Sequence, residues 1–134
     1  MAFSHGKNAV FKLNDGSVLV DLSPYLNSID FAKSADTAES TTFGKDDKTY
    51  IPGLKDGTLS LSGNFDPVAD ACLDGALGVI RAFEYYPDGT TSGKVKYAGN
   101  AIVTEYSGNS PVGDLNTASA SLQVTGGITR SVVA

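Results

Sequence analysis

Two segments of this sequence alternate between apolar and small polar residues. The apolar positions are Leu59, Leu61 and Phe65 in residues 57–65, and Ala118, Ala120, Leu122 and Val124 in residues 117–125. The polar positions between them are Thr58, Ser60, Ser62 and Asn64 in the first segment, and Thr117, Ser119, Ser121, Gln123 and Thr125 in the second. Successive side chains of a β-strand point to opposite faces, so each segment predicts a strand with one face in the core.

Turn residues divide the rest of the chain into short segments. Gly, Ser, Thr, Asn and Asp recur about every 8–12 residues between apolar runs, a spacing typical of β-sandwiches and barrels. We expect strands at residues 9–13, 17–22, 27–36, 57–65, 79–86, 94–106 and 116–125. The length of 134 residues suits a single domain over residues 1–134. The expected fold is an all-β antiparallel sandwich or barrel with one short helix.

That helix is predicted at residues 66–78. Asp66 is a good N-cap residue, and Pro67 suits the first helical position. Gly78 can end the helix. The apolar stripe expected to face the sheet consists of Val68, Ala71, Cys72, Gly75 and Ala76. We expect Cys72, the only cysteine, to be an ordinary buried core residue.

Residues 37–56 carry few strand signals, and we expect a long loop there between early strands. Segments of this length without regular structure are uncommon in compact domains and are usually functional. The large apolar residues of this loop are Phe43, Tyr50, Ile51 and Leu54. They allow two interpretations: the loop lies on a neighbouring subunit, or it folds over its own sheet.

The composition and motifs argue against an enzyme or a metal site. Ten basic and fifteen acidic residues give a net charge of −5, which disfavours tight binding to nucleic acid or to an anionic membrane. The only histidine, His5, has no partner at metal-ligand spacing. Asp46 and Asp47 fit a solvated charge run, while Asp70 and Asp74 lack the other ligands of a calcium loop. We therefore expect no catalytic residue, no cofactor and no bound metal.

The sequence shows neither a secretion signal nor a membrane span. The N-terminal residues lack the apolar centre of a signal peptide. No apolar run approaches the ~20 residues that cross a bilayer. We expect a protein that is made in a reducing cytoplasm and does not enter a membrane.

The polar rows of residues 57–65 and 117–125 contain neither lysine nor arginine. One interpretation is an ordinary solvated sheet face, since Thr and Ser suit strands well enough. The other is a smooth, wet surface along which another molecule slides, because such a surface should lack both apolar patches and cations. These residues alone leave both interpretations open.

Residues 41–67, TTFGKDDKTYIPGLKDGTLSLSGNFDP, resemble the major tail tube proteins of long-tailed (siphovirus-type) bacteriophages. The shared pattern is Thr-Thr-Phe-Gly, then Tyr-Ile-Pro-Gly-Leu, then an alternating strand that ends in Gly-x-Phe-Asp before a short helix. The order of hairpin, long loop, strand, helix and further strands is similar to the family over most of the chain.

The resemblance implies a structural virion protein whose hexameric rings stack into the tail tube that delivers DNA to the host. It implies a tape-measure protein inside the tube during assembly, and tail-tip, baseplate and terminator proteins at its ends. Double-stranded DNA would pass through without specific binding. The long loop of the family packs on neighbouring subunits, and this role carries over to residues 37–56.

The resemblance also implies that the polar rows line the bore. The residues expected there are Asp30, Asp36, Ser60, Ser62, Ser119, Ser121 and Gln123. If each of six subunits supplies four strands, the resulting barrel is roughly 48 Å wide at the backbone and its bore about 40 Å. The strand at residues 94–106, with Lys94, Lys96 and Glu105, is the better candidate for the outer wall.

A second class of function remains open, a virion decoration or adhesion module of sandwich fold that binds a carbohydrate or a surface. Such a module would be expected to expose aromatic side chains as a platform. The candidates for this platform are Tyr85, Tyr86, Tyr97 and Tyr106.

Overall fold

The computed structural model describes residues 6–134, so His5 lies outside the described residues. The elements in chain order are η1 (Gly6–Asn8), β1 (Val10–Asn14), β2 (Leu19–Asp21), η2 (Ser23–Tyr25), β3 (Leu26–Glu39), β4 (Tyr50–Asn64), α1 (Pro67–Gly75), β5 (Ile80–Tyr86), β6 (Val95–Asn109) and β7 (Thr117–Val132). Every predicted strand and the predicted helix is present, although several strands are longer than expected. The expectation of an all-β fold with one short helix is confirmed.

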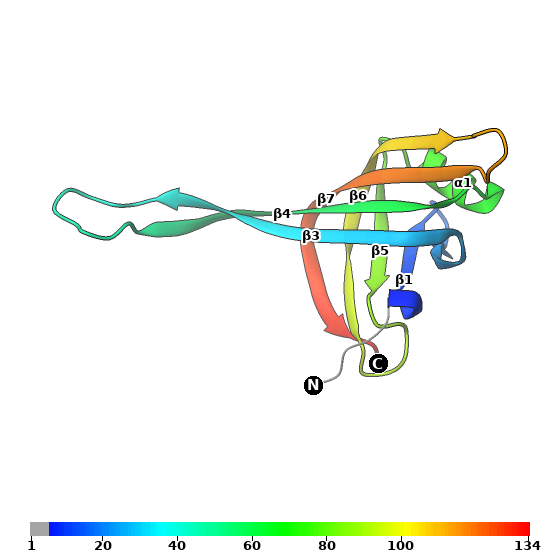
Figure 1. Cartoon of the computed structure of the whole chain (residues 1–134). Coiled ribbons are helices and arrows are strands. Elements are labelled where there is room, and N and C mark those ends of the chain that lie inside the picture. Colours follow the sequence, from blue (N-terminus) through cyan, green and yellow to red (C-terminus); the bar gives the residue numbers. More distant parts are fainter. Residues whose placement is uncertain (1–5) are drawn as a thin grey trace.

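All seven strands of the described residues form one antiparallel sheet in the order β2-β1-β5-β6-β7-β4-β3. The long strands β6 and β7 pair with each other along most of their length. One part of this pair continues into β5, β1 and β2, and the other into β4 and β3. In Figure 1 the first part of β7 runs across the view beside β4, and its last part turns down the view. The sheet therefore folds over on itself, and its two halves face each other like the layers of a sandwich.

Local irregularities bend the two long strands. The register between β6 and β7 shifts between Ala98 and Asn100, and again between Val103 and Glu105. Gly126 of β7 has a φ of 81°, a left-handed conformation that glycine adopts with little strain. The pairing of β7 with β4 ends at Gln123, so the bend follows directly after the two strands separate. One sheet can thereby cover both sides of the core.

The core lies between the two halves of the sheet and α1. It receives the apolar positions of the alternating segments, and each of these leucines is at most 2% exposed: Leu59, Leu61 and Leu122. The facing half contributes Phe11 and Phe83, whose ring centroids lie 6.2 Å apart. The alternation in the sequence therefore predicts the buried face of these strands correctly.

An aromatic cluster joins β3 to β5 and β6 across the sandwich. The ring of Phe31 on β3 lies 5.4 Å from that of Tyr85 on β5 and 5.0 Å from that of Tyr97 on β6, measured between centroids. Because β3 and β5 belong to opposite halves of the sheet, these contacts hold the halves together where no backbone pairing joins them.

Helix α1 begins as the sequence predicts. The side chain of Asp66 accepts a hydrogen bond from the backbone N–H of Val68 at 2.9 Å, and Pro67 occupies the first turn. The predicted apolar stripe is confirmed at Cys72 and Ala76, which are buried, and wrong at Val68, Ala71 and Gly75, which are exposed. The residues of α1 and its C-cap that pack on the sheet are Ala69, Cys72, Leu73 and Ala76. This stripe has the same period, and it buries the larger side chain of Leu73 instead of that of Val68.

The buried face of β4 ends at Gly63 rather than at Phe65. A Cβ atom on Gly63 would overlap the carbonyl oxygen of Tyr25, so only glycine permits this close approach to the start of β3. Phe65 follows the last residue of the strand and is 44% exposed. The expectation that Phe65 shares the buried face with Leu59 and Leu61 is therefore wrong.

Residues 33–57 form a two-stranded arm, which extends β3 and β4 beyond the rest of the sheet (Figure 1). In the arm these strands pair only with each other, since β7 pairs with β4 no further than Thr58. The pairing continues out to Glu39 and Tyr50. Figure 1 shows the arm pointing away from the body of the protein, on the side opposite α1.

The expectation of an irregular loop over residues 37–56 is wrong at both ends of that segment. Residues 37–39 and 50–56 are strand, and only residues 40–49 between them lack strand structure. Pro52 lacks a backbone N–H and lies within this strand. It is tolerated because each strand of a two-stranded arm has one free edge.

The capping contact of α1 gives a test of the fold. Asp66→Ala removes the acceptor for the Val68 N–H and should lower the free energy of unfolding by about 1 kcal/mol. Urea unfolding of the unassembled protein measures this change. Asp74→Ala, in the last turn of the same helix, is the matched control and should leave stability nearly unchanged. An Asp66→Ala protein as stable as the wild type would contradict the cap.

Candidate inter-subunit surfaces

Four neighbouring strands present one continuous polar face. In the order β3, β4, β7 and β6, the residues directly opposite one another are Ser28, Ser62, Ser119 and Ser107 in one row, and Asp30, Ser60, Ser121 and Glu105 in the next. Directly opposed residues of antiparallel strands point to the same side of the sheet. We call these two rows the polar face.

Hydrogen bonds tie parts of this face together. The hydroxyl oxygens of Ser107 and Ser119 lie 2.8 Å apart, and the Ser62 hydroxyl donates to the side chain of Asn27 at 3.5 Å. These contacts confirm that the serines of different strands share one side. The leucines that alternate with them are in the core, so the hydroxyl groups point away from the body of the subunit.

Six of the seven residues expected to line a bore are placed on or beside the polar face. Ser60, Ser62, Ser119, Ser121 and Asp30 belong to its two rows. Gln123 lies opposite Thr58 at the border of the face, and its amide donates to the carboxylate of Asp56 at 2.6 Å and to the carbonyl of Gly57 at 3.0 Å. The seventh, Asp36, lies in the arm, beyond the four paired strands.

Glu105 also belongs to this face, because it lies directly opposite Ser121. The expectation that it lies on an outer wall together with Lys94 and Lys96 is therefore not supported by its position in the sheet. Two register shifts separate Glu105 from the lysines, so simple alternation along β6 cannot relate their faces. The rows of the polar face thus carry two carboxylates, those of Asp30 and Glu105, and neither lysine nor arginine.

The polar face is bounded on both sides by unpaired strand edges. No strand of the described residues pairs with the outer edge of β3. At the other side, β5 pairs with β6 only up to Ile102, so residues 105–109 of β6 pair with β7 alone. An unpaired edge exposes backbone N–H and C=O groups that can pair with another chain.

The arm carries large apolar side chains into solvent. Phe43 is fully exposed and Leu54 is 82% exposed, while Tyr50 and Ile51 are about half exposed. The interpretation that this segment folds over its own sheet is wrong, because the arm pairs only with itself. A subunit that exposes this much apolar surface on a thin projection is suited to pack on another chain.

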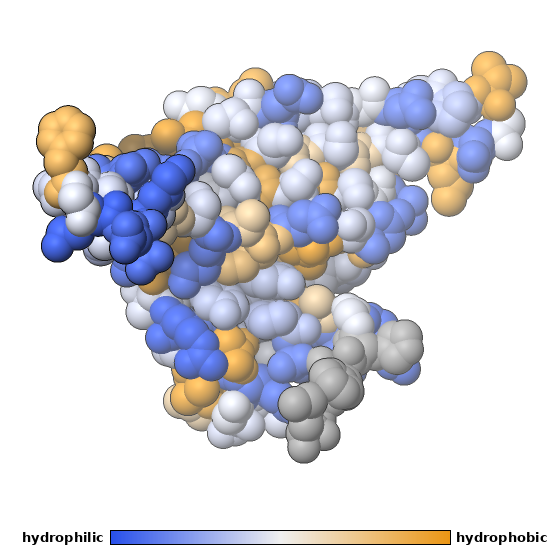
Figure 2. Space-filling model, turned by 60° about the vertical axis from the view of Figure 1, so that its left-hand side comes forward, coloured by the Kyte–Doolittle hydropathy of each residue, from blue (hydrophilic) through white to orange (hydrophobic). Residues whose placement is uncertain are grey.

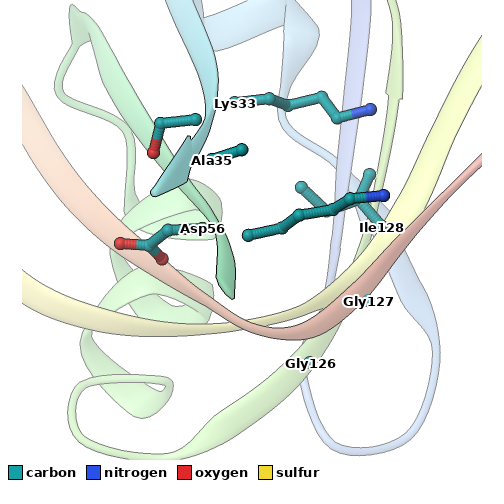
Figure 3. Close-up of a pocket in the computed structure, with 8 residues that line it drawn as sticks. Lys33, Ala35, Asp56, Gly126, Gly127 and Ile128 are labelled. Atoms are coloured by element: carbon teal, nitrogen blue, oxygen red, sulfur yellow. The ribbon is translucent and has the colours of Figure 1, made fainter. Parts of the chain in front are cut away.

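A cavity of about 450 Å³ lies where the arm leaves the sheet. Figure 3 shows it between the bases of the two arm strands and the bend of β7, with the side chains of Lys33 and Asp56 extending in opposite directions. The Lys33 amino group lies 5.4 Å from the centre of the Tyr97 ring. This cation–π contact connects the base of the arm to β6.

The tyrosines proposed as an exposed platform are used in packing. Tyr85 and Tyr97 pack on Phe31, and Tyr86 is buried. The Tyr106 hydroxyl donates to the carboxylate of Asp70 at 2.8 Å. Burial, and then the hydrogen bond to Asp70, raise the pKa of Tyr106 to about 12. These side chains do not form a flat surface for a sugar ring.

The described residues contain no cluster of three or more His, Cys, Asp or Glu side chains that could hold a metal ion. Asp46 and Asp47 are exposed in the segment that joins the two arm strands. Burial raises the pKa of the Cys72 thiol to about 11, so the thiol stays protonated near neutral pH. Among the helices described, none is both long and apolar enough to cross a membrane.

Several solved structures resemble this fold, although no protein-family model and no curated protein matches the chain. A chain in the virion of a native gene transfer agent (GTA) particle has a TM-score of 0.82 at 15% identity, covering 96% of this chain and 99% of that one. A chain in the tail of an empty GTA particle with C6 symmetry has a TM-score of 0.78 at 13% identity, with the same coverage. The SPP1 tail tube has a TM-score of 0.73 at 15% identity, covering 96% of this chain and 78% of that one. The chain thus shares its fold with components of tails and tail tubes.

The separation of arm and core predicts unequal effects of two substitutions on folding. Leu54→Asp lies on the arm and should change the free energy of unfolding by no more than about 0.5 kcal/mol. Leu61→Ala lies in the core and should cost about 2–5 kcal/mol. Urea unfolding of the unassembled proteins compares them. A large loss of stability in Leu54→Asp would show that the arm packs on its own subunit.

Proposed function

We propose that this chain, which has the fold of tail tube proteins, is the structural subunit of a phage-type tail tube. Six copies form a ring, and stacked rings form the conduit through which DNA is delivered. The observation that carries this proposal is the four-stranded polar face with an unpaired strand edge at each side. The C6 symmetry of the similar GTA tail supports the number six.

The strand directions allow the ring to close. Each of the pairs β3–β4, β4–β7 and β7–β6 is antiparallel, so β3 and β6 run in opposite directions. Rotation about a common axis preserves strand direction, and therefore β6 of one copy would meet β3 of the next in antiparallel orientation. Closure pairs both free edges of the polar face in every copy, which leaves no such edge open for a further copy and makes the ring self-limiting.

The size of the closed barrel suits duplex DNA. Six copies with four strands each would give a backbone diameter of roughly 48 Å at ordinary strand spacing and tilt, and side chains would narrow the bore to about 40 Å. The small serines of the polar face keep such a bore wide. The apolar sides of the same strands already lie in the core, so the hydroxyl groups are the side chains available to line it.

The charges of the polar face favour passage over binding. Asp30 and Glu105 would contribute two carboxylates per copy, and the face has no cation to displace counterions from phosphate. Double-stranded DNA would therefore move through without being held. The further partners are a tape-measure protein in the bore during assembly, and tail-tip and terminator proteins at the ends of a tube located in the virion.

The arm would join subunits of neighbouring rings. Its apolar residues Phe43, Tyr50, Ile51 and Leu54 have no place to be buried within their own chain, and burying each would stabilise the assembly by roughly 1.5–3 kcal/mol. The alternative function, a decoration or adhesion module, is disfavoured because the tyrosines that it would need are packed or hydrogen-bonded within the subunit.

Electron microscopy of the purified protein tests the assembly directly. The wild type should form rings or tubes in negative stain, and Leu54→Asp should remain folded but form no tubes. Sedimentation velocity provides the quantitative comparison. A wild type that stays monomeric at all concentrations, or a Leu54→Asp protein that forms normal tubes, would contradict the proposal.

Lysine substitutions test the placement of the polar face in the bore. Ser62→Lys with Ser121→Lys should leave tube assembly intact, because both side chains would point into water. Tubes carrying these lysines should retain short duplex DNA, and added salt should release it. The control places two lysines in the exposed turn after β5, as Thr90→Lys with Thr91→Lys. Equal DNA retention by wild-type and Ser62/Ser121 tubes would place the polar face elsewhere.

A further inference from the structure

A hollow of about 460 Å³ lies between α1 and the hairpin formed by β1 and β2. Its lining consists of Asp15, Val20, Pro67, Val68, Ala71 and Cys72. Most of these side chains are apolar, and Val68 and Ala71 are exposed to solvent although they lie on a helix. The subunit itself therefore leaves a small apolar recess open on its surface.

Asp15 places a carboxylate at the rim of this recess, close enough to Arg81 for the guanidinium to act on it. Its carboxylate accepts hydrogen bonds from the backbone N–H groups of Ser17 at 2.9 Å and Val18 at 3.0 Å. The hydrogen bond from Val18, and to a lesser extent that from Ser17, lowers the pKa of Asp15. The carboxylate therefore stays ionised and keeps a fixed position in the turn between β1 and β2.

The tip of the arm carries an exposed aromatic side chain. Phe43 is fully exposed, and Gly44 beside it adopts a φ of 84° in the turn that presents this side chain. After the turn, Lys45 and Lys48 flank Asp46 and Asp47, so this segment carries both signs of charge. In Figure 2, where the arm comes forward, an apolar group stands out above a hydrophilic surface. The arm thus ends in one aromatic knob, with Lys45 two residues away.

The knob and the recess lie at opposite ends of the same strands. The arm contains the first residues of β4, whereas only two residues separate the other end of β4, at Asn64, from the start of α1 at Pro67. Seven residues of β3 in the arm, 33–39, reach roughly 23 Å beyond the sheet at ordinary strand rise. One chain therefore cannot fill its own recess, but two copies stacked head to tail can meet knob to recess.

We propose that Phe43 of one copy inserts into the recess between α1 and the β1–β2 hairpin of a copy in the next ring, with Lys45 facing Asp15. This inference rests on the proposed function and names the surface that receives the arm. The contact joins two different surfaces, and such head-to-tail contacts extend without closing. It would fix the direction in which rings stack, because the ring end that carries the arms could bind only the ring end that carries the recesses.

Site-specific crosslinking identifies the surface that receives the arm tip. Phe43 is replaced by the photoreactive analogue p-benzoylphenylalanine, tubes are assembled and irradiated, and crosslinked peptides are sequenced by mass spectrometry. The expected products join position 43 to residues 18–20 or 67–71 of another chain. Crosslinks confined to the β6–β7 loop at residues 110–116, or no crosslink between chains in intact tubes, would overturn the inference.

A charge in the recess provides an independent readout. Val68→Asp should not disturb folding, because Val68 is exposed and an acidic side chain is favoured in the first turn of a helix. It should reduce the yield of tubes about tenfold or more while rings still form, since Phe43 would have to cover an unpaired carboxylate. The matched control is Val132→Asp, which changes a valine of similar exposure outside the recess and should assemble like the wild type.

The outcomes separate this inference from the proposed function. If wild-type protein forms neither rings nor tubes, the proposed function fails and the inference fails with it. If tubes form and Val68→Asp gives wild-type yields, the inference alone is overturned. Rings of Val68→Asp that do not stack, together with crosslinks into the recess, would establish the contact.

Discussion

Leucines and serines alternate along β4 and β7, and this alternation determines which side of these strands is buried and which side is polar. Leu59, Leu61 and Leu122 must be buried, and the strand geometry then turns Ser60 and Ser121 to the other side. Since the neighbouring strands β3 and β6 continue the polar rows, the four strands together form the polar face. A subunit built in this way has its core on one side of these strands and the polar face on the other.

The bend in β6 and β7 leaves the strand edges and the arm that assembly would use. Because the last part of β7 leaves β4 after Gln123, the two halves of the sheet separate and each retains a free edge. The same separation leaves β3 and β4 to extend alone as the arm. Ring closure through strand edges and ring stacking through the arm would therefore both follow from how one antiparallel sheet is divided. The GTA and SPP1 tail structures share this fold.

The parts of the fold that local patterns encode could be predicted from the sequence. Alternation predicts the buried residues of β4 and β7, and Asp66 with Pro67 predicts the start of α1. The errors arise where a contact distant in sequence decides the outcome. Pairing between β3 and β4 extends both strands through residues 37–39 and 50–56 of the arm. Register shifts between β6 and β7 bring Glu105 to the polar face. For the candidate site, the serine rows were found from the sequence, whereas the free edges and the recess need the three-dimensional arrangement.

A cryo-EM map of assembled tubes would show whether the polar face and its two free edges build the wall of the bore. Ser60 and Ser121 should face the lumen, and residues 105–109 of β6 should pair in antiparallel orientation with β3 of the adjacent copy. A map with these serines on the outer wall, or with rings closed through β2 instead of β3 and β6, would contradict this arrangement.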